Sequence, residues 1–165
     1  IAALAEWYPS DDAVIEGTDK AFYGFGKSEQ RIFILGALDR SYDEKNVRDI
    51  QESDKSIEHI FPQTVTKEWD AAFVDSHEEY QRIQDGMLDT LGNLTVVLPG
   101  ENSEVKNKLL HDKVTKYSGF EYAMTRAIPT LVAQLSAVRW GKREIHARAE
   151  ILARKSLVIW PDYRP

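Results

Sequence analysis

Two short apolar segments, each closed by a proline, constrain the fold of this chain more than any other feature. They are SIEHIFP, residues 56–62, and NLTVVLP, residues 93–99. β-Branched and aromatic side chains favour strands, and a proline ends a strand because it has no N–H to donate to a neighbouring strand. The two segments therefore predict a small β element.

The rest of the chain has the apolar spacing of helices. We predict helices over residues 29–42 and 76–92 and a last helix that ends at Ile159. A short helical turn is expected after Ser10, and another over residues 69–73. Together with the two strand segments, this pattern predicts a mostly helical α+β domain.

The connections are predicted from their polar composition and from turn residues. Asn102 or Ser103 is expected to cap a helix that runs towards Tyr117. Residues 43–55 form a polar connection, and residues 1–8 have the character of the end of a helix that is already under way. We therefore expect the chain to be a fragment of a longer protein.

Composition narrows the class of protein. The chain has 165 residues, of which 42% are hydrophobic and 29% are charged, as in an ordinary soluble globular domain. No apolar run approaches the roughly 20 residues that span a bilayer, so we expect a cytoplasmic protein without membrane contact. There is no cysteine, so a metal would have to be held by histidine, carboxylate, amide or water.

The net charge of −6 hides an uneven distribution. Residues 1–105 contain 9 Lys and Arg against 22 Asp and Glu, whereas residues 106–165 contain 12 against 5. The basic last third could face a polyanion such as DNA, which lysine and arginine bind through its phosphates. Charge alone favours the simpler interpretation that two helical faces carry opposite charge.

Polar residues mark three places around the predicted strands. Glu58 and His59 lie on the first, Asn93 opens the second, and Asn102 lies at the turn after it. A neutral imidazole can act as a general base on water, while carboxylate and amide oxygens can hold a hard cation. Phosphodiester hydrolysis needs both functions. Taken singly, the Glu-His pair is more often a surface pair, Asn93 a turn residue and Asn102 a helix cap.

Several separated motifs occur in the order known from one family. They are EHIFPQ at 58–63, LGNLTVV at 91–97, ENSEVKNKLLHDK at 101–113, and a tryptophan-to-IWP segment over 140–161. With these motifs the chain resembles the C-terminal HNH-type nuclease domain of GmrSD-like restriction enzymes, which are His-Me finger or ββα-metal nucleases. The resemblance covers residues 31–161.

The resemblance implies a ββα-metal unit embedded in flanking helices and assigns the marked residues. His59 would be the general base, and Glu58 and Asn102 would hold one divalent cation, Mg²⁺ or Mn²⁺. Asn93 would fix the loop between the strands, and therefore the geometry around the histidine. Many relatives have Asp where Glu58 stands and His where Asn102 stands, so this copy departs from the commoner set.

The resemblance also implies partners and a biological role. Asn107, Lys108 and Lys113 would face the DNA backbone. The family usually carries an upstream nucleotide-hydrolysing domain and serves bacterial restriction and anti-phage defence. We accordingly divide the chain into a helical preface, residues 1–50, and an HNH-like nuclease domain, residues 51–165.

Two other classes of function stay open from the sequence. The first is a catalytically inactive DNA-binding module of the same fold. The second is a protein-interaction domain that docks a partner through the acidic first two-thirds of the chain. Metal-dependent nicking of plasmid DNA would separate a nuclease from both.

Overall fold

The computed structural model describes residues 9–24, 26–43 and 55–161. It is a mostly helical α+β domain with one two-stranded antiparallel sheet, as predicted. The expected end of a helix over residues 1–8 and most of the polar connection lie outside the described residues. Among the described residues, no helix combines the length and the apolar character needed to cross a membrane.

The strands are β1 (Ser56–His59) and β2 (Leu94–Val97). The helices are α2 (Asp11–Glu16), α3 (Ser28–Arg40), α4 (Lys67–Ala72), α5 (His77–Arg82), α6 (Pro99–Val105), α7 (Leu110–Tyr117), α8 (Ala123–Arg126), α9 (Ile128–Gln134) and α10 (Lys142–Ile159). Shorter helical turns are η1 (Gly17–Asp19), the π-turn η3 (Ile83–Met87) and η4 (Leu91–Asn93).

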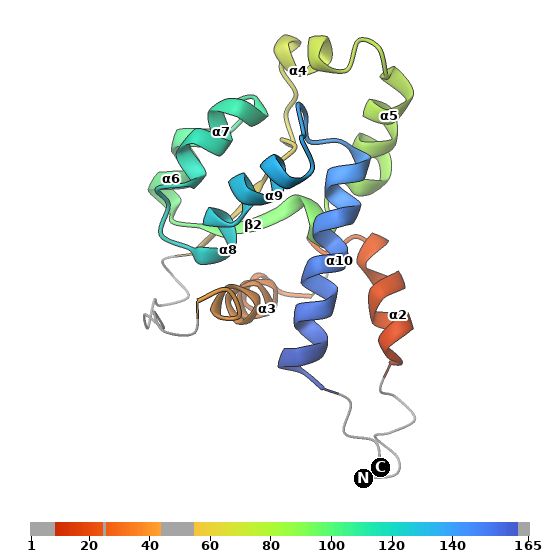
Figure 1. Ribbon diagram of the computed structural model, residues 1–165, viewed down its shortest axis with the longest axis vertical. Helices are drawn as coiled ribbons and strands as arrows, with labels where there is room; N and C mark the ends of the chain where they lie inside the picture. The colour runs from red at the N-terminus through yellow and green to blue at the C-terminus, as the bar shows by residue number, and fades with distance from the viewer. Residues whose placement is uncertain (1–8, 25, 44–54, 162–165) are drawn as a thin grey trace.

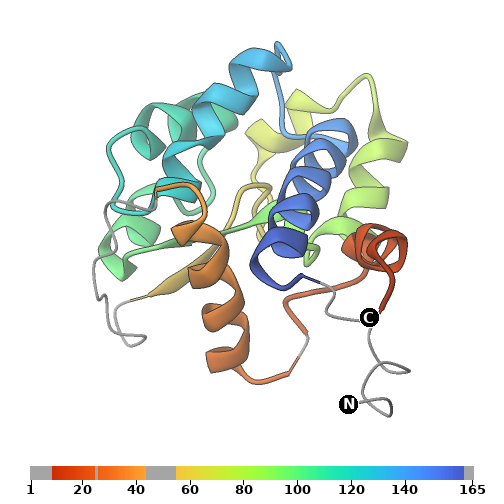
Figure 2. The same ribbon diagram turned by 60° about the horizontal axis from the view of Figure 1, so that its bottom comes forward.

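The sheet is enclosed on both faces. Glu58 pairs with Thr95 and His59 with Leu94, and all four residues of β2 are buried. Figures 1 and 2 show α2 and α3 on one side of β2 and α4, α6, α7 and α9 on the other. Because side chains alternate along a strand, Val96 packs into the cluster with α3 and Val97 into the larger cluster with α4 and α7. Both strands are therefore fixed in register by buried side chains.

The described residues of the first segment, 9–24 and 26–43, pack against the sheet and its surrounding helices. Helix α3 contacts β2, α8 and α10, and its Leu35 and Leu38 are fully buried. The backbone N–H groups of Phe22 and Tyr23 donate to the carbonyl oxygen of Asp89, at 2.7 and 2.9 Å. The segment assigned to the preface therefore reaches the connection between the two strands.

Two predicted helices differ from the observed ones. The helix expected over 76–92 ends earlier. Its last part is the π-turn η3, which ends at Met87, and Thr90 already has an extended backbone conformation. The helix expected to start at Asn102 or Ser103 already begins at Pro99, and Glu101 accepts a hydrogen bond from the N–H of Leu98 at 2.8 Å. Proline suits the first helical position, because its missing N–H would have no partner there.

The same predicted helix is also interrupted. Lys106 has φ 33° and ψ −114°, so α6 stops there and α7 starts four residues later at Leu110. Asn102 consequently lies inside α6 and not at its cap. The strands β1 and β2 and helix α6 together form the expected strand–strand–helix unit.

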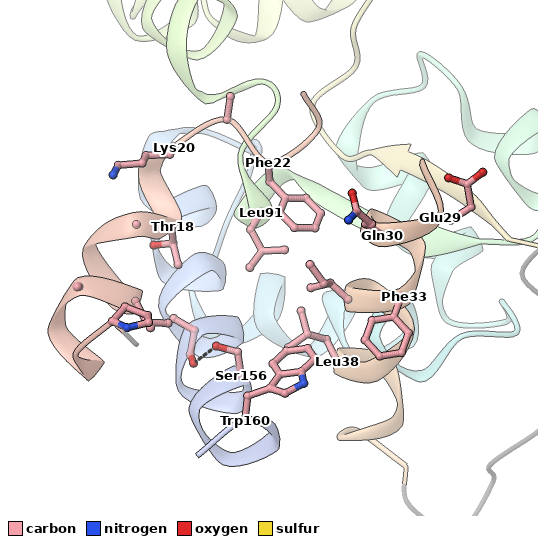
Figure 3. Close-up of a pocket in the computed structure, with 17 residues that line it drawn as sticks. Thr18, Lys20, Phe22, Glu29, Gln30, Phe33, Leu38, Leu91, Ser156 and Trp160 are labelled. Atoms are coloured by element: carbon pink, nitrogen blue, oxygen red, sulfur yellow. Dashed lines mark hydrogen bonds between the residues drawn. The ribbon is translucent and has the colours of Figure 1, made fainter. Parts of the chain in front are cut away.

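An apolar hollow of about 840 Å³ lies between α2, α3 and α10. Figure 3 shows Phe22, Leu91 and Trp160 among its lining side chains. Phe22 donates its backbone N–H to the carbonyl oxygen of Asp89, and Leu91 follows Asp89 by two residues. The hollow therefore lies beside the segment that connects the two strands. No feature of the sequence predicted it, since its lining comes from separate segments.

Candidate active site

A small pocket of about 220 Å³ lies where β1 meets α6. It is lined by Ile57, Glu58, His59, Pro62, Gln63, Thr64, Asn102, Lys106 and Asn107. The pocket therefore brings together Glu58 and His59 with Asn102 and Asn107, although more than forty residues separate the two pairs in sequence. An imidazole, a carboxylate and two amides share one recess.

The imidazole of His59 is held on two sides. Its Nε2 lies 3.0 Å from Oδ1 of Asp89, and the Tyr23 ring packs edge-on at 4.8 Å between ring centroids. Burial lowers the pKa of His59, and the hydrogen bond and charge of Asp89 oppose this shift. The ring is thus favoured in its neutral form, which a general base requires.

Two buried side chains donate hydrogen bonds to the carboxylate of Glu58. The Lys113 ammonium lies 2.5 Å from its Oε1, and the Tyr117 hydroxyl donates to the same oxygen at 3.1 Å. Burial raises the pKa of Glu58, while the Lys113 charge and these hydrogen bonds lower it. The Glu58 carboxylate thus lines the pocket with the positively charged ammonium of Lys113 already beside it.

Lys113 does not lie where a contact to the DNA backbone requires it. Its side chain is fully buried, and its ammonium also donates to the carbonyl oxygen of His59 at 2.7 Å. A phosphate cannot reach an ammonium in this position. This burial was not predictable from the sequence, because a lysine on an amphipathic helix is normally solvated.

Asn93 joins the two sides of the strand connection. Its Oδ1 accepts from the N–H of Phe61 at 2.8 Å, and its Nδ2 donates to the carbonyl oxygens of Phe61 at 3.0 Å and Leu88 at 2.8 Å. The residue is fully buried. Asn93 lies outside the pocket, and its amide fixes backbone on both sides of the histidine.

The amide of Asn102 is oriented by two hydrogen bonds to β1. Its Nδ2 donates to Oγ of Ser56 at 2.7 Å and to the carbonyl oxygen of Ile57 at 3.2 Å. Because the nitrogen is used in this way, the oxygen Oδ1 is the atom of Asn102 that is left to bind a ligand. Carboxylate and amide oxygens are the donors that Mg²⁺ and Mn²⁺ accept.

A comparison with family models identifies the family of the chain. The chain matches the family model described as GmrSD restriction endonucleases, C-terminal domain, over residues 8–155. The chain belongs to this family. A comparison with curated proteins finds no match. Because the family consists of restriction endonucleases, membership implies nuclease activity and a DNA substrate.

The GmrSD domain offers limited protein ligands to a cation. Among the described residues, no three histidine or acidic side chains come together as a metal-binding group. The pocket supplies one carboxylate and one oriented amide, so the rest of a cation's shell would be water and substrate oxygens, as is usual for Mg²⁺. The donor chemistry fits a hard divalent cation.

Three residues near the pocket were missed by the sequence reasoning. Asp89 and Tyr23 contact the histidine from distant segments, and no local spacing signals either contact. Lys106 is exposed, lines the pocket and has a backbone conformation that L-residues seldom adopt. The sequence drew attention to Lys108 instead, which is exposed but does not line the pocket.

Proposed function

We propose that this GmrSD domain is a metal-dependent DNA endonuclease or nickase in which His59 acts as the general base. The observation that carries the proposal is the shared pocket of Glu58, His59 and Asn102, in a chain whose family consists of restriction endonucleases. His59 would supply the base, Glu58 and Asn102 would supply ligands for a cation, and hydrolysis of a phosphodiester needs both functions in one place.

The proposed chemistry starts with a water in the pocket. His59 accepts a proton from this water, whose oxygen attacks the phosphorus in line with the departing 3′-oxygen. Glu58 and Asn102 would hold one divalent cation, Mg²⁺ or Mn²⁺, which when bound offsets negative charge on the phosphate and the leaving oxygen. Asn93 takes no part in the proton transfer and acts by holding the strand connection.

DNA would approach over the exposed polar rim of the pocket. Lys106 and Asn107 line this rim, and Lys108 is exposed directly beyond them. A lysine held in a costly backbone conformation beside a proposed phosphate site supports a functional role, since such strain is found mainly where function needs it. We further propose a cytoplasmic role in restriction and anti-phage defence, with an upstream nucleotide-hydrolysing domain as partner.

The test is conversion of supercoiled plasmid to the open-circular or linear form. We expect cleavage with Mg²⁺ or Mn²⁺ and none with EDTA. His59→Ala should lower the rate by about 10²- to 10⁴-fold, because general-base catalysis typically contributes that much. The control is His111→Ala, an exposed histidine, which should cleave at the wild-type rate. Equal rates for the two variants would contradict the role of His59.

A second measurement separates the base from the proposed ligands. In calorimetric titrations with Mn²⁺, His59→Ala should bind the cation like wild type, whereas Asn102→Ala and Glu58→Gln should bind it more weakly. Part of the activity lost in the last two variants should return at high Mn²⁺. Loss of cation binding in His59→Ala alone would assign the cation to the histidine.

One observation favours a second candidate function, an inactive DNA-binding module. The Lys113 ammonium already neutralises the Glu58 carboxylate, which weakens the attraction of that carboxylate for a cation. Binding of plasmid in EDTA together with no cleavage in any divalent cation would favour this candidate.

A further inference from the structure

We propose that Asp89 is a positioning residue that sets the tautomer of His59 and so selects Nδ1 as the nitrogen that accepts the proton. The inference rests on the proposed function, in which His59 is the base. The observation behind it is the contact of 3.0 Å between Nε2 of His59 and Oδ1 of Asp89, across thirty residues of sequence.

The chemistry of the two groups decides the direction of this hydrogen bond. A carboxylate can only accept, so the neutral imidazole must carry its proton on Nε2 and donate it to Asp89. The lone pair then remains on Nδ1. In neutral histidine, the hydrogen bond made by one ring nitrogen sets the role of the other. Nδ1 is therefore the basic atom.

Asp89 is itself fixed through its backbone. Its carbonyl oxygen accepts from the N–H groups of Phe22 and Tyr23, and Thr90 forms an isolated bridge with Ala21. These bonds hold the Tyr23 ring in its edge-to-face contact with the imidazole. Asp89 thus supports both the hydrogen bond and the Tyr23 ring contact that orient His59.

The strand connection holds Asp89 from the other side. Asn93 donates to the carbonyl oxygen of Leu88, the residue directly before Asp89, at 2.8 Å. Asn93 also bonds both backbone groups of Phe61, two residues after His59. The base and its acceptor are consequently tied to the same amide, which keeps their separation constant.

This arrangement has a consequence for the proton transfer. A proton moves from water to Nδ1, and the water oxygen forms a bond to phosphorus as the bond to the leaving oxygen breaks. The resulting imidazolium has both nitrogens protonated, and its charge lies beside the Asp89 carboxylate. Asp89 stabilises this charge without taking the proton. It does not touch the substrate in this scheme.

The experiment compares Asp89→Asn with wild type in the 165-residue chain. Two-bond ¹H–¹⁵N correlation spectra report the tautomer of each histidine, and His59→Gln assigns the signal of His59. Wild type should show Nε2 protonated and Nδ1 unprotonated. Asp89→Asn should show a population with Nδ1 protonated, because an amide can donate to Nε2 as well as accept from it.

Cleavage rates complete the test. Single-turnover nicking by Asp89→Asn should fall about 10-fold or more, while calorimetric binding of Mn²⁺ and plasmid binding in EDTA stay at wild-type values. The matched control is Asp85→Asn, an exposed carboxylate four residues earlier, which should change neither the spectrum nor the rate.

The outcomes separate this inference from the proposed function. A wild-type His59 protonated on Nδ1, or an Asp89→Asn variant that nicks as fast as wild type, would overturn the positioning role alone. A wild type with the expected tautomer and no nicking in any divalent cation would overturn the nuclease function, while the tautomer assignment would stand.

Discussion

At the residue scale, the buried pair of Glu58 and Lys113 is the most unusual feature of the domain. Both side chains are almost inaccessible to water, and their charged atoms lie 2.5 Å apart. Burial of a single charge is costly. The pair is tolerated because each charge compensates the other and Tyr117 donates a further hydrogen bond to Glu58. The pair also ties α7 to β1, next to the histidine.

Removing one partner of this pair should therefore destabilise the domain. We expect Lys113→Met to lower the free energy of unfolding by about 3 to 5 kcal/mol, because it leaves a buried carboxylate without a counter-charge. The double variant Glu58→Gln with Lys113→Met should recover most of this loss. Urea denaturation measures both values. Similar losses in the single and double variants would show that packing of the lysine stem, and not charge, is responsible.

The Asn93 amide gives a second prediction at this scale. Asn93→Ala should lower the free energy of unfolding by about 1 to 3 kcal/mol, because it leaves buried N–H and C=O groups of Phe61 without their partner. Thermal denaturation measures the change. The exposed amide Gln81 supplies the control, and Gln81→Ala should shift stability by less than about 0.5 kcal/mol. An unshifted melting curve for Asn93→Ala would contradict the bracing role.

At the element scale, the sequence predicted the parts of the fold that depend on local chemistry. Both strands formed in the two apolar segments that are closed by a proline, and α3 and α10 formed where apolar residues recur at helical spacing. The break between α6 and α7 was not predictable, because Lys106 and its neighbours include no glycine or proline to mark it. Tertiary contacts fix that turn, as when Trp69 donates from Nε1 to the carbonyl oxygen of Asn107.

Helix α10 secures the strand connection through one buried side chain. Nη1 of Arg148 donates to the carbonyl oxygens of Leu91, Gly92 and Leu94, at 3.3, 3.1 and 2.6 Å. Burial lowers the pKa of Arg148 to about 10. Gly92 is required beside this helix, because a Cβ there would lie 2.1 Å from the carbonyl oxygen of Ile145. The helix and the turn η4 thus pack backbone to backbone.

Arg148→Met should accordingly lower the free energy of unfolding by about 3 to 5 kcal/mol, since three carbonyl groups lose a charged donor. The matched control on the same helix is Arg154→Met, which removes an exposed pair with Glu150 and should cost less than about 1 kcal/mol. Urea denaturation measures the free energy of unfolding of both variants. Equal losses would mean that α10 is held by its apolar face alone.

At the scale of the whole molecule, the candidate site is assembled from distant segments. The family order of motifs in the sequence led us to propose Glu58, His59 and Asn102 as site residues on β1 and α6, and in the structure they line one pocket. It could not predict that Asp89 and Tyr23 would meet the histidine, or that Lys113 would turn inward, because these contacts depend on how α7 and the first segment pack. Contacts of this kind have no local signal.

The excess of basic residues after position 105 bears on DNA binding, and its outward-facing members can be tested. If DNA lies over the pocket, Lys106→Gln and Lys108→Gln should each weaken binding to all sequences similarly and reduce the slope of log affinity against log salt by about one unit. Gel shifts in EDTA over a range of salt measure this slope.

Glutamine, like lysine, is an unbranched polar side chain, so the substitution chiefly removes the charge. The control is Lys142→Gln, an exposed lysine at the start of α10 that lines a separate hollow with α5 and should leave the slope unchanged. If Lys142→Gln flattens the slope and the other two variants do not, the DNA lies over the α5 and α10 face. That result would contradict the proposed approach of DNA over the pocket of His59.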